Sequence, residues 1–263
     1  MSDFHERFGG VARVLGEAAL ARLRAAHVAV IGLGGVGSWA VEALARSGVG
    51  ALTLVDLDEV CLTNLNRQLP ALTSTVGQPK VALLAARVAD INPAARVDPR
   101  AEFFTAATAA ALLAPRYDAV LDAIDSPSLK ALLIARCRAQ GLPVVTVGGA
   151  GGRRDPTRIR VADLARTSHD PLLAEVRRRL RGEHGFPRGA APFGVDCVFS
   201  TEPLHYPDPV ECAAEAAAGA EAGPACERRF GAVCFVTGAF GFAAAAQVVA
   251  KLLGLPGLAA AGK

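Results

Sequence analysis

A glycine-rich turn near the beginning of the chain has the spacing of a phosphate-binding loop. It follows the apolar run Val28–Ile31 and precedes a predicted helix over Ser38–Arg46. Its glycines are Gly32, Gly34, Gly35 and Gly37. Glycines at these positions allow a tight turn and let a phosphate approach the amino end of the helix, where backbone N–H groups are exposed. A GxGxxG motif is weak by itself, but between a strand and a helix it favours a nucleotide site over a turn needed only for packing.

Two carboxylates follow the next apolar run at the distance expected of a ribose-binding residue. Asp56 comes directly after Leu52–Val55, and Asp58 follows shortly after it. In dinucleotide-binding folds an acidic residue about twenty positions after the glycine turn accepts hydrogen bonds from a ribose. These two features alone are compatible with NAD as well as with ATP.

Five polar residues farther along the chain favour a nucleoside triphosphate. They are Asn64, Arg67, Gln68, Lys80 and Asp125. Cleavage of ATP between its α and β phosphates develops negative charge, which Arg67 and Lys80 can neutralise, while Asp125 can hold Mg²⁺ through its oxygens. Each has an ordinary alternative: a surface arginine, a solvated lysine at a helix start, and a carboxylate that caps the helix beginning near Ser126. Their shared position at successive strand ends favours one ATP site.

The elements that must position these residues alternate between strands and helices. The predicted strands are Val28–Ile31, Leu52–Val55, Ala119–Ile124 and Pro143–Val147. The predicted helices are Ser38–Arg46, which ends at Gly48, Lys80–Asp90, and Ser126–Gln140, which ends at Gly141. This order predicts an α/β fold with a doubly wound, Rossmann-like, mostly parallel sheet that binds ligands at the carboxyl ends of its strands.

The pattern changes after residue 152. We therefore divide one adenylating domain, residues 1–263, into a nucleotide-binding half (1–152) and a smaller half (153–263) for substrate and dimer contacts. In the second half we predict strands at Arg158–Val161 and Val195–Phe199, with a basic helix at Leu172–Arg181 between them. Ala213–Gly223 is of low complexity, and we predict a mobile loop there.

A long apolar helix is predicted over residues 230–250, which carry no charge and could span a membrane by length. Their alanine and glycine content favours a buried helix packed on the sheet, with peripheral membrane association as the alternative.

The charged N-terminus does not resemble a signal peptide, and the six cysteines of the 263-residue chain contain no CxxC pair. A reducing cytoplasm is therefore the expected compartment. The net charge of +3 by itself indicates no partner.

The ordered motifs resemble those of the ubiquitin-activating-enzyme-like superfamily, which includes the bacterial activators of molybdopterin- and thiamine-pathway sulfur carriers. The motifs are GLGGVGS from Gly32, LVDLDEV from Leu54, TNLNRQ from Thr63, VGQPK from Val76 and LDAIDS from Leu121. The resemblance implies that Asp56 binds the ribose and that Asp125 binds magnesium. It also implies a homodimer, with the phosphates bound by Asn64, Arg67 and Lys80.

Further motifs are similar to the tRNA threonylcarbamoyladenosine dehydratase branch of that superfamily. They are RFGG from Arg7, TVGGAGG from Thr146, VDCVFSTE from Val195 and FGA from Phe230. The implied reaction is ATP-dependent closure of the threonylcarbamoyl group on an adenosine beside the anticodon of tRNA. The carboxylate would attack the α-phosphate, and the neighbouring urea would then displace AMP. Because this closure is intramolecular, no covalent enzyme intermediate is required. A sulfur-relay protein is a further candidate partner.

The chain departs from the sulfur-carrier activators at two points. It lacks their paired zinc cysteines, and Gly10 replaces an arginine that reaches the partner's ATP, which leaves Arg7 or Arg13 for that role. The main alternative function is still an adenylating activator of a ubiquitin-like sulfur carrier; a non-catalytic adaptor and a nicotinamide oxidoreductase are weaker alternatives. We interpret Cys197 and Cys226 as small buried residues, because no histidine or lysine lies obviously beside either to activate a thiol.

Two basic clusters lie outside the predicted ATP site. One leads into a loop with His184 and Arg188 and comprises Arg177, Arg178, Arg179 and Arg181. The other comprises Arg153, Arg154, Arg158 and Arg160. A small metabolite would not need these cations, whereas a tRNA backbone would, so we predict tRNA contacts there. Solvated helix faces are the ordinary alternative.

The purified protein is expected to contain no stoichiometric zinc, because its cysteines lack the paired spacing of a structural zinc site. Elemental analysis checks this expectation. One zinc per chain would contradict it and would favour the sulfur-carrier alternative.

Overall fold

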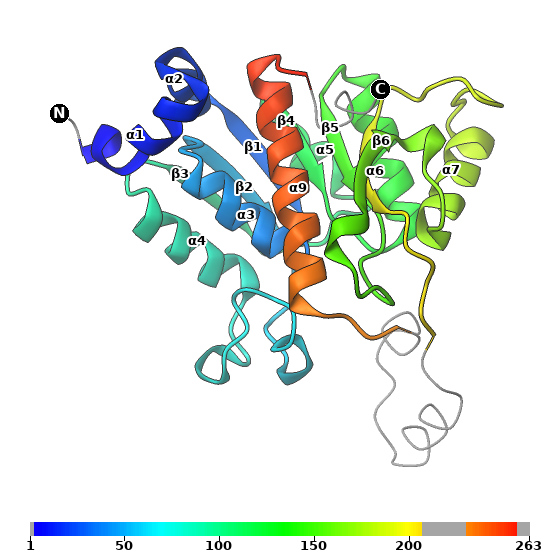
Figure 1. Ribbon diagram of the computed structural model, residues 1–263, viewed down its shortest axis with the longest axis horizontal. Helices are drawn as coiled ribbons and strands as arrows, with labels where there is room; N and C mark the ends of the chain where they lie inside the picture. The colour runs from blue at the N-terminus through cyan, green and yellow to red at the C-terminus, as the bar shows by residue number, and fades with distance from the viewer. Residues whose placement is uncertain (1–2, 207–229, 257–263) are drawn as a thin grey trace.

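The structure, a computed structural model, describes residues 3–206 and 230–256. At its centre is a seven-stranded sheet in the order β3-β2-β1-β4-β5-β7-β6 (Figure 1). The strands are β1 (His27–Ile31), β2 (Ala51–Val55), β3 (Arg96–Arg100), β4 (Ala119–Asp122), β5 (Val144–Val147), β6 (Ile159–Asp163) and β7 (Asp196–Ser200). β6 runs antiparallel to β7, and the other described pairings are parallel. The predicted loop at Ala213–Gly223 lies outside the described residues.

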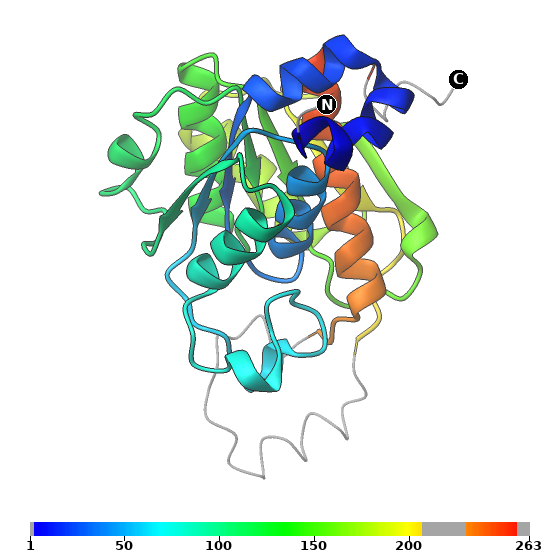
Figure 2. The same ribbon diagram turned by 90° about the vertical axis from the view of Figure 1, so that its left-hand side faces the viewer.

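Helices cover both faces of the sheet, as the side view in Figure 2 shows. The α-helices of the described residues are α1 (Asp3–Leu15), α2 (Glu17–Ala25), α3 (Gly37–Arg46), α4 (Lys80–Ile91), α5 (Ala109–Leu112), α6 (Pro127–Ala139), α7 (Pro171–Glu183) and α9 (Cys234–Leu253), of which α1 lies at the end of the strands. Val28 and Val30 of β1 share one core with α3, α4 and α9, whereas Ala29 and Ile31 share another with α5, α6 and α7. Successive residues of β1 therefore face opposite helix layers, as the two-residue period of a strand requires.

This architecture confirms the predicted α/β fold, its mostly parallel sheet and its long apolar C-terminal helix. Two predicted boundaries differ clearly from the structure: the long helix is Cys234–Leu253 and not residues 230–250, and β4 ends at Asp122 and not at Ile124. The Asp122 Oδ1 accepts a hydrogen bond from the Ile124 N–H at 3.1 Å, which forms an Asx turn and ends the strand. The strand β3 was not predicted, because it is an edge strand with exposed charged residues and shows no apolar alternation.

Small residues let α9 lie close to α3. A Cβ on Gly241 would stand 2.7 Å from the Trp39 Cβ and 2.7 Å from the Val36 carbonyl oxygen, so only glycine fits there. By length and composition α9 could cross a membrane, yet 56% of its most apolar window is buried inside the protein. The glycine and alanine content of α9 therefore serves its packing on the sheet, which favours the buried-helix interpretation.

A buried ion pair ties β4 to β5 and α6. Lys130 and Asp122 are both 0% exposed, and the Lys130 Nζ lies 2.9 Å from the Asp122 Oδ2. Lys130 also donates to the Thr146 Oγ1 at 3.1 Å, and that hydroxyl donates to the Asp122 Oδ2 at 2.7 Å. Because Asp122 also forms the turn that ends β4, this network fixes the start of the loop that carries Asp125.

Replacing Lys130 with methionine is expected to lower the free energy of unfolding by about 3–5 kcal/mol, because Asp122 would remain buried without its counter-charge. Chemical denaturation measures this change. The double variant Asp122→Asn, Lys130→Met should recover most of the loss, since asparagine keeps the acceptor for Ile124 and no charge is buried. A loss below about 1 kcal/mol for Lys130→Met, the level of a surface pair, would contradict the prediction.

Candidate functional site

The predicted ATP residues gather where the strand order reverses, between β1 and β4. β1 pairs with β2 on one side and with β4 on the other. Open α/β sheets bind ligands at the carboxyl ends of strands at such a point. We call the carboxyl ends of β1, β2, β4 and β5, at Ile31, Val55, Asp122 and Val147, the nucleotide edge; it lies along the lower side of the sheet in Figure 1.

The glycine turn is crowded at Gly32 and Gly37 and open at Gly34. Gly32 has φ +90°, and a Cβ there would lie 2.8 Å from the Ala123 carbonyl oxygen. A Cβ on Gly37 would collide with the Gly32 carbonyl oxygen. At Gly34, by contrast, the nearest atom to a Cβ would be the Gln68 Nε2 at 3.9 Å. The turn therefore leaves a space beside Gly34, which we call the phosphate cradle. A larger side chain would fill this space, whereas glycine leaves room for a phosphate.

Asp56 connects this turn to the end of β2. Its Oδ2 accepts the Leu33 N–H at 2.6 Å, and its Oδ1 accepts the Asp58 N–H at 2.8 Å. Burial raises the pKa of Asp56, and the charge of Lys80 opposes that shift. Each carboxylate oxygen has a second lone pair, so Asp56 can accept a hydrogen bond from a ribose hydroxyl while it holds the turn.

Lys80, the first residue of α4, is buried and not solvated. It is 4% exposed, and its Nζ forms an ion pair with the Asp58 Oδ2 at 2.9 Å. The interpretation of Lys80 as a solvated helix-start residue is therefore wrong. The pair places a cation beside Asp56 at the nucleotide edge, where a phosphate oxygen can replace the half-exposed Asp58 as its partner.

The backbone of Arg67 is held between α3 and α9. Its carbonyl oxygen accepts hydrogen bonds from the Trp39 Nε1 at 3.0 Å and from the Thr237 Oγ1 at 3.3 Å. The Arg67 Cγ lies 3.4 Å from the position of a Cβ on Gly35, so the side chain passes beside the glycine turn. Its Nη1 donates to the Thr63 carbonyl oxygen at 2.8 Å. The structure thus brings Arg67 to the phosphate cradle.

Asn64 and Gln68 are both buried on the same segment. The Asn64 Oδ1 accepts the Cys61 N–H at 3.1 Å, so this amide organises the loop. The Gln68 Oε1 is buried and has no hydrogen-bond partner in the part of the chain that the structure describes. A buried acceptor without a donor is costly, and therefore points to a donor on a bound molecule.

Asp125 lies exposed on the loop between β4 and α6. The N-cap residue of α6 is Ser126, so Asp125 does not cap that helix. Within residues 3–206 and 230–256 the Asp125 carboxylate makes no hydrogen bond or ion pair, and no group of three acidic, histidine or cysteine side chains gathers there. One or two carboxylates that share Mg²⁺ with substrate phosphates and water form the usual site in nucleotide enzymes, so Asp125 fits this ion.

Arg153 brings the second half of the chain to the nucleotide edge. It is 2% exposed, and it donates to the carbonyl oxygens of Gly149 at 2.9 Å, of His169 at 3.0 Å and of Glu202. Its Nη2 lies 3.5 Å from the Asp170 Oδ2. The prediction that Arg153 contacts tRNA is therefore wrong, because its guanidinium is buried and hydrogen-bonded inside the protein.

An aromatic pair lies beside the turn that follows β5. The ring centroids of Tyr206 and Phe230 are 5.0 Å apart, and Tyr206 is 67% exposed. The His205 N–H donates to the Gly152 carbonyl oxygen at 2.8 Å, and the Gly152 N–H donates to the Gly231 carbonyl oxygen at 2.8 Å. These bonds tether both aromatic residues to the turn. An exposed aromatic face next to a nucleotide site suits the stacking of an unstacked RNA base.

Sequence reasoning missed the residues that hold the site together. Trp39 and Thr237 support Arg67, and neither has a motif that announces this role. Asp170 is different: its side chain accepts the Leu173 N–H as the N-cap of α7, and an aspartate before Pro171 is a recognisable helix-start signal.

The four arginines predicted to contact tRNA all lie on α7. Arg178 and Arg179 form ion pairs with Glu175 at 2.6 and 2.8 Å. Arg177 donates to the Thr167 Oγ1, and Arg181 donates to backbone carbonyl oxygens of the following loop. The four side chains therefore differ in how much of their charge is already compensated.

Two cysteines of the described region, Cys137 and Cys197, are buried and are not activated thiols. Cys197 is 0% exposed, and burial raises its pKa well above that of an ordinary thiol. Burial likewise raises the pKa of Cys137 to about 12. These values support the interpretation of Cys197 as a small buried residue, whereas Cys226 lies outside the described residues.

The arginines of α1 lie far from the nucleotide edge of their own chain. Phe4 and Phe8 of α1 pack near Gly48, which precedes the amino end of β2. Arg7 pairs with Asp3 at 3.0 Å, and Arg13 is exposed. Since Figure 1 places α1 at the opposite end of the strands, neither arginine completes the ATP site within one chain.

Comparison with known proteins gives matches over nearly the whole chain. Residues 9–263 match the ThiF family. The tRNA threonylcarbamoyladenosine dehydratase of Escherichia coli K12 is 48% identical over 253 residues, which cover 95% of this chain and 94% of that protein. Its namesake in Haemophilus influenzae is 46% identical over 255 residues, which cover 96% and 95%. The crystal structure of the E. coli dehydratase in complex with ATP has a TM-score of 0.86 and 46% identity, and covers 96% of each chain.

These matches include both the glycine turn and the second half with Arg153, Asp170 and α9. The similarity therefore extends over both halves of the described fold. The chain belongs to the ThiF family, and it resembles tRNA threonylcarbamoyladenosine dehydratases over nearly its whole length.

Proposed function

We propose that this protein is an ATP-dependent dehydratase that closes the threonylcarbamoyl group of a modified adenosine beside the anticodon of tRNA into a ring. One observation carries the proposal: enzymes of that name match the chain through both of its halves. The nucleotide edge supplies what adenylation needs, which is a phosphate cradle, the cations of Arg67 and Lys80, and the exposed carboxylate of Asp125.

The reaction activates one group of the substrate against another. The carboxylate oxygen of the threonylcarbamoyl group bonds to the α-phosphorus of ATP, and the bond from that phosphorus to the pyrophosphate oxygen breaks. A urea nitrogen then bonds to the acyl carbon, and AMP leaves with the former carboxylate oxygen while the nitrogen releases a proton. The nucleoside loses one water overall. Both groups belong to one nucleoside, so their effective concentration is high and the enzyme needs no nucleophile of its own.

The residues of the nucleotide edge divide the binding of ATP among themselves. Backbone N–H groups of the glycine turn, Arg67 and Lys80 bind the phosphates, and Asp56 binds the ribose. Gln68 is placed to accept a hydrogen bond from the nucleotide through its buried Oε1. Mg²⁺ held by Asp125 would supply further neutralisation of the phosphate charge.

We place the base of the target adenosine on the exposed ring of Tyr206. The hydrogen bonds at Gly152 hold the Tyr206 and Phe230 segments at the end of β5, next to the nucleotide edge. A base stacked there would direct its threonylcarbamoyl group toward the bound ATP. Stacking is also tolerant of the bulky modification, because it uses the face of the base.

We further propose a homodimer that works in the cytoplasm. Arg7 and Arg13 lie too far from the nucleotide edge of their own chain, so either could reach ATP only in a second copy. The cytoplasm is where the tRNA substrate is found, and the packing of α9 against α3 supports its role as a core helix. The sulfur-carrier alternative is less well supported, because the matches to dehydratases extend through the second half of the chain.

Asp125→Ala is expected to lower kcat by on the order of a hundredfold or more while the protein folds normally, because metal-assisted charge stabilisation is lost. AMP and pyrophosphate release, together with nucleoside analysis of the tRNA, measure the effect. The matched control is Asp90→Ala, which removes an exposed carboxylate from α4 and should leave kcat unchanged. Release of ADP and phosphate in place of AMP and pyrophosphate would contradict adenylation.

Tyr206→Ala is expected to raise the KM for tRNA by about tenfold, since stacking of one base contributes roughly 1–3 kcal/mol. Tyr206→Phe keeps the ring and should keep a KM close to that of the wild type, and the KM for ATP should stay the same in both variants. Steady-state kinetics with modified tRNA provide the test. An unchanged KM for tRNA in Tyr206→Ala would show that the base binds elsewhere.

A further inference from the structure

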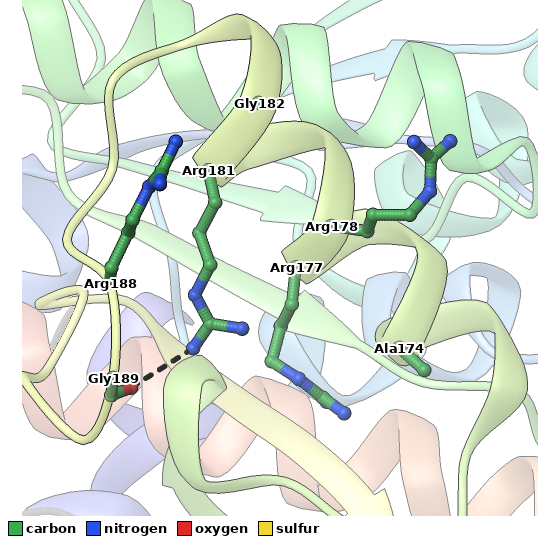
Figure 3. Close-up of a pocket in the computed structure, with 7 residues that line it drawn as sticks. All are labelled: Ala174, Arg177, Arg178, Arg181, Gly182, Arg188 and Gly189. Carbon is green, nitrogen blue, oxygen red and sulfur yellow. Dashed lines mark hydrogen bonds between the residues drawn. The ribbon is translucent and has the colours of Figure 1, made fainter.

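A pocket of about 570 Å³ opens between α7 and the loop that follows it (Figure 3). Four of its lining residues are arginines, namely Arg177, Arg178, Arg181 and Arg188. The other lining residues are glycine and alanine, so no carboxylate of the described chain lines it. A cavity with this lining attracts an anion.

Two of the arginines on α7 are already neutralised. The Nε and Nη2 of Arg178 each donate to the Glu175 carboxylate at 2.6 Å. Arg179 bridges Glu175 at 2.8 Å and Glu183 at 3.2 Å. Figure 3 shows that the Arg178 side chain points away from those of Arg177 and Arg181. Arg178 and Arg179 therefore contribute little charge to the pocket.

The other three arginines form no ion pair with a carboxylate within residues 3–206 and 230–256, although the charge of Asp170 acts on Arg177 and opposes the lowering of its pKa. Arg177 donates to the Thr167 hydroxyl, Arg181 donates to neutral carbonyl oxygens such as that of Gly189 at 3.2 Å, and Arg188 makes no hydrogen bond at all there. Burial and then the charge of Arg181 lower the pKa of Arg177, so the two guanidinium groups repel each other. An anion between them would relieve this repulsion.

Packed aromatic rings support the side of the pocket that carries Arg181. The Arg181 guanidinium lies over the Phe193 ring, 5.0 Å from its centroid, and Phe193 is 2% exposed. Phe193 packs edge-on against Phe186 at 5.1 Å, and the Arg138 guanidinium covers Phe186 at 4.6 Å. The aromatic rings hold Arg181 in place without consuming its charge, so little conformational entropy is lost when an anion binds.

The position of the pocket shows how large its ligand must be. The side chain of Asp170, the N-cap of α7, accepts the Gly149 N–H at 2.9 Å, so the helix begins at the nucleotide edge. With a rise of 1.5 Å per residue, Arg177 and Arg181 lie about 9–15 Å farther along the helix. The phosphates of an ATP bound at the glycine turn cannot reach them, whereas a polyanion that starts at the nucleotide edge can.

We propose that Arg177, Arg181 and Arg188 form a binding site for a backbone phosphate of the tRNA, a short distance along the strand from the adenosine at the nucleotide edge. This inference rests on the proposed function, because that function supplies the polyanion. Of the four arginines of α7 that the sequence predicted to contact tRNA, the proposal retains two, and it adds Arg188 from the loop. Arg178 and Arg179 are excluded because Glu175 neutralises them.

Equilibrium binding of tRNA to the full chain at several salt concentrations tests the site. Arg188→Ala is expected to weaken binding about fivefold at 0.15 M salt and to lower the salt slope by up to about 0.7, the contribution of one phosphate contact on a single strand. Adding Arg181→Gln should weaken binding further. The matched control is Arg178→Ala, which removes an arginine from the same pocket and should change the affinity less than twofold, because Glu175 already compensates its charge.

Three outcomes would overturn the site. One is a wild-type affinity and salt slope in the Arg181→Gln, Arg188→Ala double variant. The second is an Arg178→Ala effect as large as that of Arg188→Ala. In the third, inorganic phosphate binds by calorimetry and loses this binding in Arg188→Ala, while tRNA binding is unaffected; this result would assign the pocket to a small free anion.

Nucleoside analysis of tRNA incubated with wild-type protein and ATP tests the proposed function separately. Absence of ring closure together with Arg188-dependent tRNA binding would contradict the proposed function and support the phosphate site. Ring closure together with tRNA binding that does not depend on Arg188 would contradict the phosphate site alone.

Discussion

The backbone at Gly32 and Gly37 packs so closely on its surroundings that no side chain fits at either position. Gly32 faces the Ala123 carbonyl oxygen at the end of β4, so the turn after β1 and the loop that carries Asp125 are forced together. This contact joins the phosphate cradle to the carboxylate suited to Mg²⁺. The rest of the candidate site depends on it, because Asp56, Lys80 and Arg67 are each positioned relative to that turn.

Buried charges hold the loops of the nucleotide edge in place. Asp122 and Lys130 fix the loop after β4, and Arg153 and Asp170 fix the turn after β5 to the start of α7. A buried ion is tolerated only when it is paired and hydrogen-bonded, so each pair permits few arrangements of the backbone around it. The need to pair a buried charge also explains why Arg153 is unavailable to RNA, although its neighbours in the sequence are basic.

The arginines of α7 differ in their charge compensation because of local ion pairing along the helix. Side chains three or four positions apart on a helix meet, so Glu175 reaches both Arg178 and Arg179. Arg177 and Arg181 face the other way, toward the loop with Arg188, and their hydrogen-bond acceptors in the described chain are neutral oxygens. The basic sequence of α7 therefore forms two different faces. On one face glutamates neutralise the arginines, and on the other face the arginines form no ion pair in the described chain.

The sequence by itself determined the architecture and predicted which residues would form an ATP site. Strands such as β1 and β2 are apolar runs between glycines and polar residues, and their order with α3 and α4 allows few folds besides a doubly wound sheet. The motifs singled out Gly32, Asp56 and Asp125, which follow the ends of β1, β2 and β4, together with Arg67 and Lys80 on the segment that leads from β2 into α4. Local pattern sufficed there, since the carboxyl ends of parallel strands share one edge.

Only the tertiary structure decided the state of each charge. Lys80, for which a solvated position at a helix start was the alternative to phosphate binding, is buried against Asp58, whereas Arg153 looked like part of a basic surface and lies in the interior. Trp39 and Thr237 support Arg67 from elements that are distant in the chain. Burial and pairing depend on which groups meet across the fold, and no local pattern of residues encodes those meetings.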